Sequence, residues 1–273
     1  MIAPPSTDLR NRLRGLWLPL VTPFDNGAVD ETSLRRLVRH YAHRPIDGLI
    51  LAATFGEGMT LERAELEQIV MLVRSELSGI RRYLPICLGL SGAGTSHMLD
   101  LLDETATWPI DGYLIASPYY LRPSQRGLTE HFAALADHAS WPIVLYNIPY
   151  RTAVNLNNET LLTLAAHPNI VGLKDCCADR AQSADLLRRR PSGFRILTGE
   201  DAQYYDAIAH GADGAILLSA HVETESFAAV KPSSRRAIAT PRWRDGKTFR
   251  ISSSCCFPNP APRPRSTGSR VLG

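Results

Sequence analysis

The chain has 273 residues, of which 44% are hydrophobic and 21% are charged. This composition is typical of a globular protein with a core and excludes a chain that is disordered throughout. A formal net charge of +3 is too small to indicate nucleic-acid binding by itself. No run approaches the roughly 20 apolar residues of a membrane helix, so we expect a soluble, cytoplasmic protein without a membrane partner.

The charge is distributed unevenly along the chain. Ten of the 30 basic residues and one of the 27 acidic residues lie from Lys231 onward, so that segment carries +9 and residues 1–230 carry −6. The same segment contains six of the 19 prolines and seven serines, and it has no apolar period. We therefore predict a catalytic domain over 1–230 and a loosely ordered basic tail over 231–273, rich in Pro, Ser and Arg.

Short apolar segments recur at regular intervals in the first part of the chain. Continuous apolar segments of this length are typical of strands that are buried on both faces, as in a parallel sheet. The eight segments are residues 15–21, 47–53, 85–90, 111–116, 142–147, 169–174, 195–199 and 213–218.

Amphipathic stretches lie between these segments and predict helices. One begins at Glu31, and one runs from an N-cap at Thr60 through apolar residues at helical spacing to Leu77. Residues 129–139 and 159–166 have the same pattern. Eight strand and helix units of about 29 residues predict an α/β fold of the (β/α)8 TIM-barrel type. A doubly wound open sheet is the alternative, but it needs a glycine-rich phosphate turn that the sequence lacks.

The cysteine and histidine patterns argue against a metal or disulfide framework. The five cysteines form no Cys-x-x-Cys pair, and we interpret them as free thiols. The eight histidines include no His-x-His or His-Glu-x-x-His spacing, so we expect no metal site.

Reacting groups in a TIM barrel come from the carboxyl ends of the strands and the loops that follow them. Lys174 ends one apolar segment, and a desolvated lysine loses part of its preference for the charged form and can attack a carbonyl as a neutral amine. The alternative is a lysine paired with Asp175 or with another carboxylate at the strand end. Tyr146 ends the preceding segment and is either a proton relay or a core aromatic. Arg151 either binds a substrate carboxylate with two hydrogen bonds or is a surface residue.

Several ordered motifs carry a resemblance to a known family. Residues 146–152, Tyr-Asn-Ile-Pro-Tyr-Arg-Thr, and 169–175, Asn-Ile-Val-Gly-Leu-Lys-Asp, closely resemble motifs of the dihydrodipicolinate synthase / N-acetylneuraminate lyase family of class I aldolases. Residues 53–58, 117–125 and 211–216 match further blocks in the same order. The match runs from about Gly15 to Val230 and is closest to the dihydrodipicolinate synthase branch, on account of Arg151.

The resemblance implies a role for each matched residue. Lys174 would form an imine with pyruvate, without any cofactor, and Tyr146 would relay protons. Thr54 would bind the pyruvate carboxylate, and Arg151 would bind the carboxylate of an aldehyde substrate. Tyr120 would reach into the site of a partner subunit in a homo-oligomer, a dimer or a tetramer.

The resemblance also places Phe55 and Ile216 among the substrate-binding positions. Phe55 stands where the family has a second threonine. A phenyl ring cannot pass a proton, so we expect the usual Thr-to-Tyr relay to be broken there and the condensation to be slow.

The tail departs from the family as well. From about residue 231 the chain has Ser, Arg and Pro in place of the family's helices, although residues 255–260 faintly resemble the family's Phe-x-x-Pro-Asn-Pro stretch. We hypothesise a shifted reading frame from that point. Translation of the gene in the other two frames tests this idea.

The leading hypothesis is a Schiff-base lyase that condenses pyruvate with L-aspartate-4-semialdehyde to a cyclic product, a step of lysine and diaminopimelate biosynthesis. The first alternative is another 2-keto acid aldolase or dehydratase of the same family, which Phe55 keeps open. The second is a non-catalytic relative that binds a keto acid. We expect small-molecule keto acid and aldehyde partners and no nucleic acid.

Overall fold

The structure is a computed structural model that describes residues 9–80 and 82–230. The predicted basic tail over 231–273, and with it the hypothesis of a shifted reading frame, lies outside the described residues. The boundaries of the domain over 1–230 therefore stay a prediction. Its fold can be compared with the structure.

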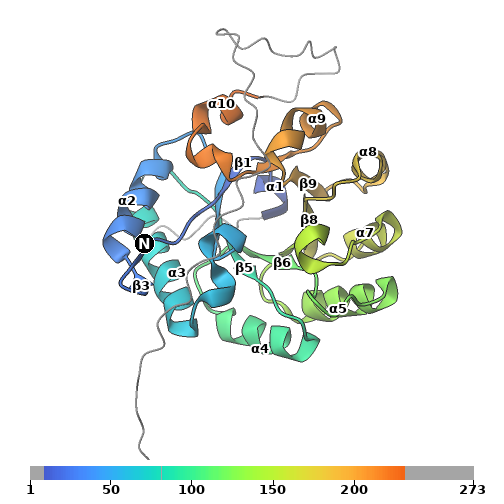
Figure 1. The fold of residues 1–273 in the computed structure, drawn as a ribbon, viewed down its shortest axis with the longest axis horizontal. Helices are drawn as coiled ribbons and strands as arrows, with labels where there is room; N and C mark the ends of the chain where they lie inside the picture. The colour runs from blue at the N-terminus through green and yellow to red at the C-terminus, as the bar shows by residue number, and fades with distance from the viewer. Residues whose placement is uncertain (1–8, 81, 231–273) are drawn as a thin grey trace, which may run out of the picture.

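Eight parallel strands close into a barrel at the centre of the molecule (Figure 1). Going round the barrel, each strand pairs with the next, and β1 pairs with both β10 and β4. The strands are β1 (Gly15–Pro19), β4 (Gly48–Leu51), β5 (Ile86–Leu90), β6 (Gly112–Ala116), β7 (Ile143–Asn147), β8 (Ile170–Asp175), β9 (Arg195–Thr198) and β10 (Gly214–Ile216). Each one lies within or overlaps a predicted segment, so the TIM-barrel prediction is confirmed.

The helices form a ring around the strands, in chain order (Figure 1). The ring consists of α2 (Glu31–Ala42), α3 (Arg63–Ser78), α4 (Thr95–Thr105), α5 (Gln125–His138), α7 (Asn158–Ala165), α8 (Arg180–Arg189), α9 (Tyr204–Ala209) and α10 (Thr224–Ala228). A small hairpin of β2 (Phe24–Asp25) and β3 (Ala28–Val29) precedes α2. No helix of the described chain is long and apolar enough to cross a membrane.

The start of α3 differs from the prediction. The N-cap is Glu62 and not Thr60, because Glu62 and Glu65 form a capping box in which each side chain accepts from the other residue's backbone N–H. Thr60 instead ends a short 3-10 turn, and its hydroxyl donates to the carbonyl of Glu57. Both Thr60 and Glu62 have side chains that can cap the start of a helix. The geometry of the loop after β4 decides which of them does so.

Apolar side chains form two clusters, one between the barrel and the helices and one inside the barrel. The short helix α1 (Leu9–Arg12) contributes to the inner cluster through Leu9, and Leu13 follows from the next turn. Gly112 and Gly172 make room for these leucines, since a β-carbon at either glycine would lie within 2.4–2.6 Å of a leucine methyl. Apolar side chains from α1 thus pack into the barrel, away from the carboxyl ends of β7 and β8.

Candidate active site

Lys174 lies inside the barrel, near the carboxyl end of β8. It is opposite Tyr146 of β7 in the sheet register, and its Nζ is 4.2 Å from the centroid of the Tyr146 ring. The side chain is only 1% exposed. Burial lowers the pKa of Lys174 below that of an ordinary lysine, while Cys176, Glu200 and Asp201 act in the opposite direction. The amine therefore reaches its neutral, nucleophilic form more readily than a surface lysine does.

Asp175 is not the partner of Lys174. Successive residues of a strand point to opposite faces, and the Asp175 carboxylate points outward, where it accepts from the Ser183 hydroxyl at 2.6 Å and from the Cys177 backbone N–H at 3.0 Å. No carboxylate in the described part of the chain forms a salt bridge with Lys174. The alternative of a structural Lys174–Asp175 pair is therefore wrong.

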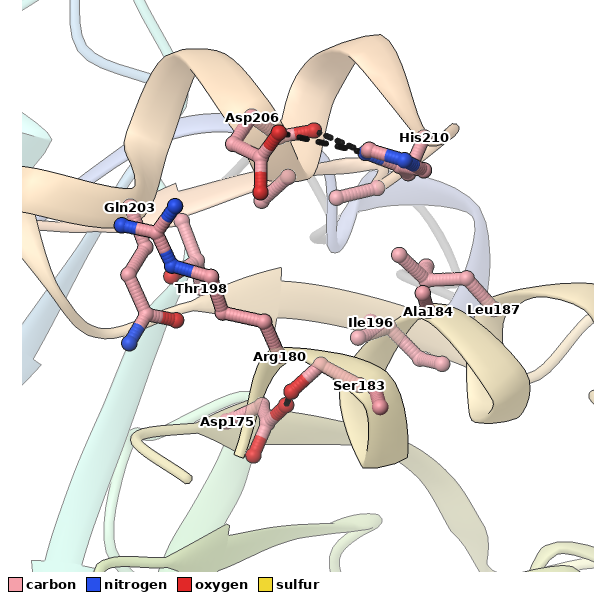
Figure 2. A pocket seen from close by; sticks show the side chains of 13 residues that line it. Asp175, Arg180, Ser183, Ala184, Leu187, Ile196, Thr198, Gln203, Asp206 and His210 are labelled. Carbon is pink, nitrogen blue, oxygen red and sulfur yellow. Dashed lines mark hydrogen bonds and ion pairs between the residues drawn. The ribbon is translucent and has the colours of Figure 1, made fainter. Parts of the chain in front are cut away.

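A cavity of about 210 Å³ lies on that outer side of the barrel, between α8 and α9 (Figure 2). Figure 2 shows Asp175 and Ser183 on one side of it and the hydrogen-bonded Asp206 and His210 on the other. Lys174 and Tyr146 do not line this cavity. The cavity is therefore separate from the surroundings of the buried Lys174 amine.

Tyr146 is buried beside Lys174, within hydrogen-bonding reach of the Thr54 hydroxyl. Burial raises the pKa of Tyr146 well above its usual value, so the phenol stays protonated and can donate. The hydroxyl beside Tyr146 belongs to Thr54, and Phe55 takes no hydroxyl away from it. The expectation that Phe55 breaks the Thr-to-Tyr relay stays a prediction, which the Phe55→Thr variant tests.

The loop after β4 holds Thr54 in place. Thr54 begins the 3-10 turn η1 (Thr54–Gly56), whose Gly56 carbonyl accepts from the Thr22 hydroxyl at 2.7 Å. Glu57 then adopts a left-handed φ of 53°. The next residue has to be glycine, because a β-carbon at Gly58 would lie 1.7 Å from the carbonyl oxygen of Ala52. The tight turn leaves Thr54 and Phe55 half-buried.

Arg151 lies on the helical turn α6 (Pro149–Thr152), which directly follows β7. Its guanidinium is exposed, stacks over the Tyr150 ring at 5.7 Å, and has no hydrogen bond or salt bridge to the described residues. The turn is anchored from below, because buried Asn147 donates to Asn155 at 2.9 Å and accepts from the Leu156 backbone N–H at 3.1 Å. This leaves an unpaired cation over the mouth of the barrel.

The remaining two predicted site residues lie at opposite extremes of burial. Ile216 ends β10, is 1% exposed and belongs to the inner cluster with Tyr146. Tyr120 is 85% exposed and has a left-handed φ of 72°, a strained conformation for a residue with a β-carbon. Tyr120 is not part of the buried surroundings of Lys174 within one chain.

Sequence reasoning missed three residues near Lys174, namely Cys176, Glu200 and Asp201. All three act on the pKa of Lys174 in the direction opposite to burial. The sequence contained a signal for two of them. Glu200 and Asp201 directly follow the apolar segment 195–199, so they come after the end of a strand, much as Lys174 lies at the end of the segment 169–174. The described residues contain no cluster of three or more His, Cys, Asp or Glu side chains able to hold a metal ion.

Comparison with known proteins places this barrel in one family. Residues 12–233 match the model of the dihydrodipicolinate synthetase family. The chain belongs to this family. It is 41% identical over 256 residues to 4-hydroxy-tetrahydrodipicolinate synthase 2 of Clostridium acetobutylicum, covering 92% of this chain and 87% of that protein. The synthase of Geotalea uraniireducens is 33% identical over 217 residues, covering 80% and 74%.

Solved structures of the dihydrodipicolinate synthetase family superpose on the same region. A monomeric dihydrodipicolinate synthase variant matches with a TM-score of 0.76 at 30% identity, covering 81% of this chain and 74% of that one. The Aquifex aeolicus enzyme matches with a TM-score of 0.74 at 30% identity, covering 79% and 73%. The predictions of family, fold and a lyase like 4-hydroxy-tetrahydrodipicolinate synthase are confirmed.

Proposed function

We propose that the protein condenses pyruvate with L-aspartate-4-semialdehyde through an imine on Lys174 and needs no cofactor. The observation that carries the proposal is the buried, unpaired amine of Lys174 directly over the Tyr146 ring. The names of the related synthases support the choice of reaction.

The first half of the reaction concerns pyruvate alone. The neutral Lys174 amine attacks the C2 carbonyl, and loss of water leaves an imine. Loss of a C3 proton then converts the imine to a nucleophilic enamine. Tyr146, with Thr54 beside it, would relay these protons, its hydroxyl proton leaving as another arrives. Thr54, Phe55 and Ile216 would line the keto acid.

The second half brings in the aldehyde. The enamine carbon attacks the aldehyde carbon, and the amine of the semialdehyde then displaces Lys174 and closes the ring. Arg151 is the unpaired cation at the mouth that would bind the carboxylate of the aldehyde. Tyr120, exposed and strained, would complete the site of a second copy of the chain in a homo-oligomer. The proposed setting is the cytoplasm and lysine biosynthesis.

Borohydride reduction in the presence of pyruvate tests the proposal, because reduction turns the imine into a stable adduct. We expect one pyruvate-derived adduct, located on Lys174 by peptide mass spectrometry and absent from Lys174→Ala. Labelling that persists in Lys174→Ala contradicts the assignment.

A panel of aldehydes assayed with pyruvate then tests the second substrate. L-Aspartate-4-semialdehyde should give the highest kcat/KM. A higher value for an aldehyde without an amine would identify another 2-keto acid aldolase of the family.

A further inference from the structure

The guanidinium of Arg151 is exposed and is held in place by an aromatic ring. Its Cζ lies 5.7 Å from the centroid of the Tyr150 ring, and no hydrogen bond or salt bridge joins it to the part of the chain that the structure describes. An arginine that is free to move loses side-chain entropy when it binds a carboxylate, and this loss weakens binding. The position of the Tyr150 ring therefore determines how well Arg151 is ordered before a substrate arrives.

A hydrogen bond fixes the Tyr150 ring at its other end. Tyr150 is 63% exposed, so packing alone does not hold it. Its hydroxyl donates to Oε1 of Glu200 at 2.8 Å. A phenol has an ordinary pKa of about 10 and is protonated at neutral pH, so Tyr150 is the donor. Because the acceptor is a carboxylate, this bond is stronger than one between neutral groups.

The hydrogen bond between Tyr150 and Glu200 joins two loops across the end of β8. Tyr150 lies on the turn α6 that follows β7, Glu200 follows β9, and β8 pairs with both of these strands. The neighbour of Glu200, Gly199, packs against Lys174, since a β-carbon on Gly199 would lie 2.7 Å from Lys174 Cε. The bond therefore fixes the ring relative to the strand that carries the reactive amine.

We propose that Glu200, through Tyr150, positions Arg151 for the carboxylate of the aldehyde and so makes the site select aldehydes that carry a carboxylate. Tyr150 and Glu200 are positioning residues and do not touch the reacting atoms. With the ring fixed, Arg151 is ordered before the aldehyde binds, and less entropy is lost on binding. The inference rests on the proposed function, since it concerns the second substrate of that reaction.

Steady-state kinetics of Tyr150→Phe tests the hydrogen bond, because this variant keeps the ring and loses only the hydroxyl. KM for L-aspartate-4-semialdehyde should rise by about 3- to 10-fold, the effect that ordering one long side chain has on binding. KM for pyruvate and the extent of borohydride labelling should stay at the level of the natural chain. A change that merely disturbs the barrel would affect both substrates.

Two substitutions of Glu200 form a matched pair. Glu200→Gln and Glu200→Ala both remove the negative charge, but only the glutamine keeps an oxygen that accepts from Tyr150. Glu200→Ala should show the higher KM for the aldehyde, and Glu200→Gln should recover most of the difference. Double variants then show through which residue the effect passes. Tyr150→Phe should add nothing to Glu200→Ala and nothing to Arg151→Ala, because the members of one contact series are not additive.

The two proposals fail in different ways. A natural chain that traps no pyruvate overturns the proposed function and this inference with it. Normal trapping and an unchanged KM for the aldehyde in Tyr150→Phe overturn the positioning role alone. Additive effects of Tyr150→Phe and Arg151→Ala also overturn it, since Tyr150 would then bind the aldehyde by itself. Equal KM values in Glu200→Gln and Glu200→Ala would show that the hydrogen bond from Tyr150 to Glu200 has no part in binding.

Discussion

Thr54 and Phe55 are adjacent residues with different surroundings, and this difference predicts different mutational effects. Thr54→Val removes the hydroxyl beside Tyr146 but keeps the branched shape, so turnover should fall by roughly 10²-fold or more while the imine remains trappable. Phe55→Thr should not raise turnover, because the hydroxyl that contacts Tyr146 is already present. Parallel measurement of trapping and condensation checks both. A faster Phe55→Thr enzyme would restore the original expectation that the ring breaks the relay.

At Arg151, substitutions can separate the effect of the positive charge from the effect of the guanidinium shape. Arg151→Ala should raise KM for the aldehyde by about 10- to 100-fold and leave KM for pyruvate nearly unchanged, since a hydrogen bond to a charged group is worth about 1.5–3 kcal/mol. Arg151→Lys keeps the charge but cannot donate two parallel hydrogen bonds, so its effect should lie in between. Steady-state kinetics with each substrate varied in turn is the measurement. A change in KM for pyruvate alone would show that Arg151 binds pyruvate and not the aldehyde.

At the level of elements, the contact between α4 and α5 contains a titratable group. Buried His131 of α5 shares a hydrogen bond with the Thr95 hydroxyl at 2.8 Å, while its Nε2 has no partner among the described residues. Burial lowers the pKa of His131 from 6.5 to about 4. Between these values the unfolded chain binds the extra proton and the folded chain does not, so stability falls as pH falls from 6.5 towards 4.

This pair predicts a pH-dependent stability difference. The loss should amount to about 3 kcal/mol over that window, because one pKa unit corresponds to about 1.36 kcal/mol. Urea unfolding of the natural chain and of His131→Gln at pH 7.5 and pH 4.5 measures it. The natural chain should lose more unfolding free energy than His131→Gln when the pH is lowered from 7.5 to 4.5. A constant difference would mean that His131 titrates normally in the folded state.

The elements also show where sequence patterns are reliable. Every strand of the barrel lies at a predicted apolar segment, because burial on both faces demands continuous apolar residues. The start of α3 was misplaced by the Thr60 signal, since Glu62 and Glu65 cap each other. A cap depends on the φ and ψ of the preceding loop, and here that loop contains the left-handed Glu57.

For the whole molecule, the exposed Tyr120 and its neighbour Leu121, 63% exposed, predict self-association. The strained φ of Tyr120 holds an aromatic ring outward, and such rings are enriched at protein interfaces. We expect a dimer or tetramer by analytical ultracentrifugation, with Leu121→Arg shifting it towards monomer and lowering turnover. The control is Val222→Arg, because Val222 is also exposed. A fully active monomer of the natural chain would remove the role of Tyr120 across subunits.

The order of residues predicted the barrel and the positions of Lys174, Tyr146 and Arg151 at or after the carboxyl ends of its strands. In a parallel barrel the carboxyl ends of all strands meet at one edge, so residues at the ends of apolar segments are brought together whatever the details. Only the folded chain decided which groups touch: that the Lys174 amine lies over the Tyr146 ring, that Asp175 turns outward to Ser183, and that Cys176 and Lys174 both pack against Gly199. Those contacts depend on strand register and on single loop dihedrals, which are set by packing between residues distant in sequence and are not encoded in any local pattern.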